Sequence, residues 1–375
     1  MDERLRVYPR IFIALYVLIG GWWILSGPGL MDRGGNPVGG DFITFWAAGS
    51  MWLEGVPHQA WDLDLIHLAE SAALGTELPA DAAYGWFYPP PAMLGAGLLA
   101  LVPYSVSLAG WLLLSAGLYT LVCSRIRPDA LSLGLALAFP GLFQNLIHGQ
   151  NGCLTMALLG GGLLLLEKRP WLAGAVLGLL IYKPHLLPVV GIALVAGRHG
   201  RAALGLVFSA TLWVIISAGL VGMDSWFAFV DTLPFAMSIV DHAGPEWWSK
   251  MPSTAAAVRL LGGGTMWAQG ANALVALASV VATCWLWVRG VSKERRYSAL
   301  VVTALLATPY AFHYDLTVLV LPLLWLAPWN GRRRGLAALL WLSPVLTLVL
   351  ARLTSIQLGP VLLLGLLAVC LRDDT

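Results

Sequence analysis

The sequence predicts an all-α, polytopic integral membrane protein, as its composition, its repeated apolar segments and the placement of its basic residues each indicate. Of the 375 residues, 58% are hydrophobic and only 11% are charged, whereas a soluble domain usually carries about 25% charged residues. So few charges cannot cover a water-soluble fold, because a folded protein in water still needs a polar exterior. The net charge is only +2, and we expect membrane lipids, not nucleic acid, as the surrounding partner.

The loops between the apolar segments fall into two chemical classes that alternate along the chain. The positive-inside rule places the basic loops in the cytoplasm. Their basic residues are Arg4, Arg6, Arg10, Arg125, Arg127, Lys168, Arg169, Arg198, Arg201, Arg289, Lys293, Arg295, Arg296, Arg332, Arg333 and Arg334. The other loops contain few Lys or Arg residues and are placed outside; the two long ones are residues 28–88 and 222–266. The alternation predicts a single domain over residues 1–375, with about twelve membrane segments and both termini cytoplasmic.

The first elements of the chain lead from the membrane to its outer side. A span over residues 10–27 lacks a small-residue cleavage site, so we expect a retained helix. In residues 41–55 the apolar and aromatic positions share one helical face, which predicts an amphipathic helix on the outer membrane surface. Residues 89–124 are too long for one span, so we expect a short outer-leaflet or re-entrant helix over 90–102, broken at Pro103, before the true crossing.

Several later segments are too short to cross the membrane. A helix over residues 171–182 would rise about 18 Å, whereas the hydrocarbon core is about 30 Å thick. It would leave Lys183 below the outer interface, and the next segment, over 186–197, is equally short. A short segment over 297–311 would leave His313 and Asp315 at a similar depth. Buried ionisable groups persist where they line a wet cavity or bind a partner, although Lys183 alone could snorkel to the interface. The short helices therefore predict a polar cavity open to the outside.

Three motifs on the outer side carry side chains suited to binding or catalysis. Asp41 precedes the amphipathic helix, where it would act as an N-cap or as a general base for an acceptor hydroxyl. The aromatic–proline step that contains Tyr88 would anchor a membrane segment or pack on the face of a sugar. His148, Gln150 and Asn151 form a glycine-flanked turn that would be simply polar or would present hydrogen-bond donors to the cavity.

Two further motifs add cations and an acid. Lys183 would be a point-charge partner for a lipid phosphate, with His185 as a second donor. His313 would hydrogen-bond a phosphate or an acceptor hydroxyl, or assist Asp41, or serve only a structural role beside Asp315. No HExxH, EF-hand, Walker or dinucleotide glycine motif appears in the sequence, so we expect neither a metal ion nor another cofactor.

In this order the motifs resemble the polyprenol-phosphate-sugar-dependent GT-C glycosyltransferases, specifically glycosyltransferase family 87. The resemblance extends from about residue 8 to about residue 330. The matching pieces are Asp41-Phe, Phe87-Tyr-Pro-Pro, Gly149-Gln-x-Gly, Ala173-Gly-x-x-Leu-Gly before Lys183-Pro, and Thr308-Pro-x-x-x-His.

The resemblance implies a GT-C fold that transfers a mannosyl or related hexosyl group, with inversion, from polyprenyl phosphate to a lipid or glycan acceptor. The active site would face the periplasm or exterior of the inner (plasma) membrane. Asp41 would be the general base, Lys183 a ligand of the donor phosphate and His313 a second active-site group. The first loop lacks the paired acids of some GT-C relatives, so Asp41 would act alone or with His313. The alternatives are a polytopic transporter or flippase of a lipid-linked glycan, or a polymer ligase that uses another carrier.

Overall fold

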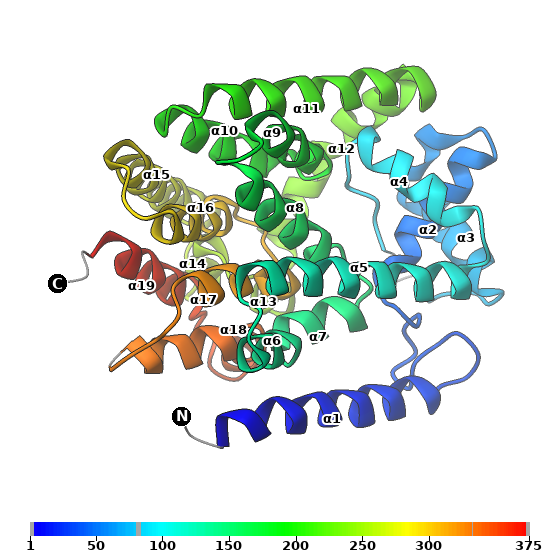
Figure 1. Cartoon of the computed structure of the whole chain (residues 1–375). Helices are drawn as coiled ribbons and strands as arrows, with labels where there is room; N and C mark the ends of the chain where they lie inside the picture. Colours follow the sequence, from blue (N-terminus) through cyan, green and yellow to red (C-terminus); the bar gives the residue numbers. More distant parts are fainter. Residues whose placement is uncertain (1–3, 80–83, 332, 373–375) are drawn as a thin grey trace.

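The computed structural model of the chain describes residues 4–79, 84–331 and 333–372, and within them it is built from helices (Figure 1). In these ranges the only β-type pairing is an isolated bridge between Met31 and Pro37. The all-α prediction is confirmed. Arg332 lies outside the described residues, as do residues 80–83 of the first outer loop and the side chains of Arg4 and Arg6.

Five helices of the described chain are long and apolar enough to cross a membrane. They are α1 (Arg4–Leu25), α5 (Tyr104–Ile126), α11 (Gly200–Leu220), α15 (Thr265–Arg289) and α18 (Arg333–Thr354). A sixth span would be α6 (Ala130–Leu137) together with α7 (Pro140–Ile147), which meet at a bend of 41°. The number of about twelve segments stays a prediction, because the remaining apolar helices are shorter than the roughly 20 residues that a crossing needs.

The short segments expected on either side of Lys183 are confirmed. They are α9 (Pro170–Gly178) with η3 (Leu179–Tyr182), and η4 (Pro184–Leu186) with α10 (Leu187–Ala196). The remaining short helices of the membrane region are α8 (Gly152–Leu165), α16 (Lys293–Ala307), η5 (His313–Leu319), α17 (Val320–Trp325) and α19 (Gly359–Leu371). Helix α16 is buried along nearly its whole length and forms the centre of the main core.

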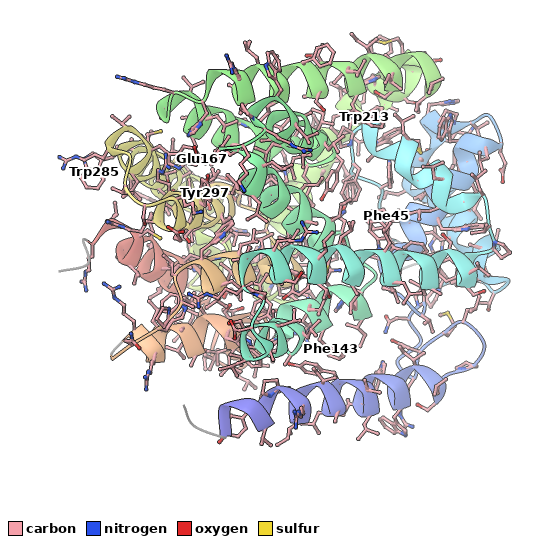
Figure 2. All side chains as sticks on the ribbon, viewed as in Figure 1. Phe45, Phe143, Glu167, Trp213, Trp285 and Tyr297 are labelled. Carbon is pink, nitrogen blue, oxygen red and sulfur yellow. The ribbon has the colours of Figure 1, made fainter. Side chains whose placement is uncertain are left out.

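The basic loops gather at one end of the molecule. Figure 1 shows both chain termini at the same end, and Figure 2 shows Glu167 and Tyr297 near it, with Phe45 toward the other end. A guanidinium nitrogen of Arg296 lies 3.6 Å from a Glu167 carboxylate oxygen, and Arg295 donates to the Cys370 carbonyl at 2.8 Å. Residues from three predicted cytoplasmic segments therefore meet, as the alternation of loops predicts; the assignment of this end to the cytoplasm stays a prediction.

The first outer loop folds as a small helical unit around its own core. Its helices are α2 (Phe42–Leu53), η1 (Pro57–Trp61) and α3 (Leu63–Leu74), which pack with α4 (Pro90–Ala100). Contact between α2 and α4 is very close, since a Cβ at Gly49 would lie 2.1 Å from the Ala96 carbonyl oxygen. The short helix and its break at Pro103 are confirmed by α4 and by the start of α5 at Tyr104, and its place on the outer side stays a prediction.

Helix α2 differs from its prediction. It was expected to rest on the outer membrane surface, but eight of its twelve positions are buried, and they surround the helix on all sides. The apolar stripe that suggested contact with lipid instead contacts protein. Phe45 packs against Trp86, Tyr88 and Trp111, with ring centroids 5.3–6.2 Å apart. A single sequence pattern cannot distinguish these two apolar surroundings.

The second outer loop contributes α12 (Met223–His242), α13 (Pro245–Ser249) and α14 (Thr254–Leu260). Its middle part is held inside the molecule. Gln357 donates a hydrogen bond to the Ser249 carbonyl at 3.2 Å, and the Cα of Pro252 would lie 2.8 Å from a Cβ at Gly359. The segment around α13 is therefore a fixed wall of the protein, anchored by the loop between α18 and α19.

Candidate active site

The turn between α7 and α8 is the centre of the candidate site. Gly149 has φ +57°, a left-handed conformation that favours glycine. Buried Asn145 fixes the turn, because its amide nitrogen donates to the Gln150 carbonyl at 2.7 Å and its amide oxygen accepts from the Cys153 N–H at 3.0 Å. At Gly152 a Cβ would lie 2.7 Å from the Tyr314 carbonyl oxygen, so only glycine allows the 308–315 segment to approach this closely.

Asp41 faces this turn. It directly precedes α2, yet its side chain makes no capping hydrogen bond to the helix, so the N-cap alternative is wrong. Instead the Gln150 side-chain amide donates to Asp41 Oδ2 at 2.8 Å, and the Tyr314 hydroxyl hydrogen-bonds the same carboxylate. Asp41 is half-buried. The carboxylate is therefore held by two neutral donors, and no cation takes part in these hydrogen bonds.

Tyr88 and Asn151 orient the Gln150 amide. The Asn151 amide donates to the Tyr88 hydroxyl at 2.8 Å, and this hydroxyl donates to Gln150 Oε1 at 3.4 Å. Since Gln150 Oε1 also accepts from the Asn151 N–H at 3.1 Å, its NH₂ group must point to Asp41. The predicted residues 88, 150 and 151 thus form one hydrogen-bond network, which directs the Gln150 side-chain NH₂ group to the Asp41 carboxylate.

His148 and His313 form a pair of rings, and each ring also contacts Tyr314. Their centroids lie 5.2 Å apart at an interplanar angle of 75°. His148 Nδ1 lies 2.8 Å from the Gln144 carbonyl, which can only accept, so Nδ1 donates this hydrogen bond. His313 is 4% exposed, and neither of its ring nitrogens has a hydrogen-bond partner among the described residues.

The His313 ring is buried without a partner for either nitrogen among the described residues. A neutral imidazole has one N–H donor and one acceptor nitrogen. A buried ring with both positions unused is costly unless a ligand uses them.

Lys183 and Asp315 are paired with each other. The ammonium nitrogen lies 2.6 Å from Asp315 Oδ1, and the two side chains are 10% and 19% exposed. Asp315 Oδ2 accepts from the Phe312 N–H at 2.9 Å. Lys183 therefore does not snorkel to the interface. The Asp315 carboxylate already compensates the charge of Lys183, which weakens the prediction that Lys183 binds the donor phosphate.

His185 is the predicted site residue that the network leaves out. Its half-buried ring packs edge-on against Tyr310, with centroids 5.3 Å apart, and makes no hydrogen bond to the other candidate residues in the described chain. The other eight candidates are connected in two groups. One group contains Asp41, Tyr88, His148, Gln150, Asn151 and His313, and the second is the Lys183–Asp315 pair, which shares the 308–315 segment with the first.

Three further residues at this site were not selected from the sequence. Tyr314 binds Asp41, and its position between two candidates was the available signal. Lys250 accepts the His313 N–H with its carbonyl at 2.9 Å. Glu70 is fully buried, and burial raises its pKa to about 8, with the charge of Asp41 adding to the effect. No sequence motif contains Lys250 or Glu70, so no signal in the sequence would have selected them.

The family comparison bears directly on this arrangement. The model of glycosyltransferase family 87 matches residues 86–309, more than half of the chain. The chain belongs to glycosyltransferase family 87. It is therefore a membrane glycosyltransferase, and the family resemblance is confirmed. The matched stretch includes Tyr88, the 148–151 turn and Lys183, whereas Asp41 and His313 lie outside it. No curated protein and no solved structure matches the chain.

Proposed function

We propose that this glycosyltransferase moves a mannosyl or related hexosyl group from a polyprenyl-phosphate carrier to a hydroxyl of a lipid or glycan acceptor. The transfer takes place at the outer face of the inner (plasma) membrane. The observation that supports it most is the Asp41 carboxylate, held by Gln150 and Tyr314 beside the His148–His313 pair. This cluster lies at the start of α8, whereas the basic loop around Glu167 follows the end of that helix; its 14 residues rise about 21 Å.

The reaction is a direct displacement. The acceptor oxygen forms a bond to the anomeric carbon as the bond from that carbon to the carrier's phosphate oxygen breaks. The acceptor proton passes to Asp41, which acts as general base. The bonding electrons leave with the phosphate, so polyprenyl phosphate departs as an anion and needs no general acid.

The other residues position the base and the leaving group. Gln150 and Tyr314 keep the Asp41 carboxylate in place by hydrogen bonds that survive its protonation in part. Donors that face the departing phosphate stabilise charge as it develops, and such preorganised donors are worth a few kcal/mol each. Because protein cations can serve here, we propose a transfer that needs no metal ion, for which an unchanged rate in excess EDTA is the check.

Asp41→Asn tests this function. The variant keeps an acceptor for the Gln150 amide but cannot take a proton, so the fold is retained while the chemistry is lost. Wild-type protein in nanodiscs, supplied with radiolabelled polyprenyl-phosphate sugars and a pool of lipid and glycan acceptors, transfers label. Asp41→Asn loses about 10²–10⁴-fold in rate. Asp64→Asn, which changes an exposed carboxylate of the same loop, is the matched control. Full transfer by Asp41→Asn would remove Asp41 from the mechanism; carrier movement without transfer would favour the flippase alternative.

A further inference from the structure

Lys250 brings a second cation to the candidate site. Its carbonyl accepts the His313 N–H at 2.9 Å, so its backbone lies directly against the 308–315 segment. The neighbouring Trp247 ring packs edge-on on Phe312, with centroids 6.0 Å apart, and the Lys250 ammonium lies 5.2 Å from the centre of that same Trp247 ring. The ammonium thus lies over Trp247 on the fixed wall around α13, and the main chain of the same residue is bonded to His313.

Two other cations near this wall, Lys183 and Arg259, have fixed partners. Lys183 forms its short ion pair with Asp315. The guanidinium of Arg259 donates to the Gly263 carbonyl at 3.1 Å and to the Asp241 carbonyl at 2.7 Å. Neither group can turn to a ligand without leaving a buried or half-buried partner unsatisfied.

Lys250 is different because its partner is an exposed one. Its ammonium lies 3.3 Å from Glu246, whose side chain is 72% exposed, and ion pairs in water contribute little. Arg352 lies 3.8 Å from the same carboxylate oxygen, so Glu246 keeps a cationic neighbour when Lys250 turns away. A lysine side chain is long and flexible, with three rotatable donors, so it can exchange this contact for a better anion.

His313 supplies an independent sign that a ligand binds here. Its imidazole is buried, and both nitrogens lack a hydrogen-bond partner among the described residues. An imidazole N–H, together with a flexible ammonium on the residue bonded to the His313 main chain, is suited to an anionic oxygen. This anion would be bound by groups other than Gln150, which holds Asp41 through its side-chain amide. A displacement with inversion requires the base and the leaving group to act on opposite faces of the anomeric carbon.

Given the proposed function, we propose that Lys250 and His313 bind the phosphate of the lipid carrier, and that Lys183 instead holds Asp315 and with it the 308–315 segment. In this arrangement the sugar lies between the Asp41 carboxylate and the phosphate. Lys250 offers a point charge to the departing anion, and His313 offers a hydrogen bond from a neutral ring.

Binding of the carrier itself is the test. Purified wild type, Lys250→Gln and Lys250→Arg are placed in nanodiscs with radiolabelled polyprenyl phosphate, and with unphosphorylated polyprenol of the same length. Loss of a hydrogen bond to a charged group corresponds to a 10- to 100-fold loss of affinity, so Lys250→Gln weakens polyprenyl phosphate binding by about that factor. Binding of polyprenol stays unchanged, and Lys250→Arg recovers much of the loss. Arg352→Gln, which removes the exposed cation on the other side of Glu246, is the matched control.

The outcomes separate this inference from the proposed function, since binding is measured without transfer. The role of Lys250 is overturned if Lys250→Gln binds polyprenyl phosphate as tightly as wild type does, while thermal unfolding shows that both proteins are folded. An equal loss for polyprenol and polyprenyl phosphate also overturns it, because the effect would then not depend on the phosphate. Failure of the wild type to transfer sugar from any polyprenyl-phosphate donor, while Lys250→Gln still loses phosphate affinity, counts against the donor assignment alone.

Discussion

Replacing Lys183 by Met should destabilise the protein strongly, because it leaves the Asp315 carboxylate without its cation. Their contact is 2.6 Å long, and the side chains are 10% and 19% exposed. Breaking a fully buried pair by removing one partner costs about 3–5 kcal/mol. Since Asp315 is partly exposed, we expect about 3 kcal/mol, which for a chain of 375 residues corresponds to a fall in apparent Tm of roughly 4 °C.

A double-mutant cycle distinguishes the ion pair from simple packing. Asp315→Asn keeps an oxygen that can accept from the Phe312 N–H, a bond of 2.9 Å in the wild type, while it removes the negative charge. The combined Lys183→Met and Asp315→Asn variant has no unpaired charge, so it should recover more than half of the loss seen with Lys183→Met alone. Thermal unfolding in nanodiscs measures all four proteins. Additive losses, or a Lys183→Met variant as stable as wild type, would refute the structural role of this pair.

Three further predictions follow from single contacts. Tyr314→Phe removes the hydroxyl bonded to Asp41 and should lower the transfer rate about tenfold at unchanged apparent Tm; an unchanged rate would contradict it. Burial raises the pKa of Glu70 from 4.5 to about 8, so the stability linked to its proton is complete below about pH 4.5 and is lost as pH rises through 8. Apparent Tm should therefore fall between pH 5 and pH 8 in wild type, with a flatter dependence in Glu70→Gln, and equal slopes would count against it. Gly152→Ala, whose Cβ would lie 2.7 Å from the Tyr314 carbonyl oxygen, should cost about 1–3 kcal/mol in thermal unfolding, unlike Gly161→Ala in the same helix, where nothing lies within 4 Å.

Elements set by local chain properties were predictable from the sequence. The break at Pro103, the short segments before and after Lys183 and the 148–152 turn all follow from proline, glycine and apolar length, and each is confirmed. The surroundings of α2 were not predictable. Its apolar positions show only that this helix avoids water. Whether it contacts lipid or protein depends on α4 and α5, which come later in the chain and pack against it.

The site was predictable as a set of residues but not as a set of contacts. Glycine-flanked and proline-flanked polar motifs on one side of the membrane marked Gln150, Lys183 and His313. Which of them pair could not be derived, because Lys183 meets Asp315 across 132 positions and Gln150 meets Asp41 across 109 positions. Lys250 carries no motif at all. Its place at the site follows from a main-chain hydrogen bond, for which any residue type would serve.

The two lysines should be separable by kinetics, because they act on different parts of the same segment. Tyr314 binds the Asp41 carboxylate, and the main chain of the residue before it, His313, donates to the Lys250 carbonyl. Lys183 holds Asp315, the residue after it, so loss of Lys183 releases the base and the phosphate site together. Its substitution should therefore lower kcat and carrier affinity at once. Substitution of Lys250 leaves the ion pair and the bond between Tyr314 and Asp41 in place, so it should act mainly through contacts with the phosphate.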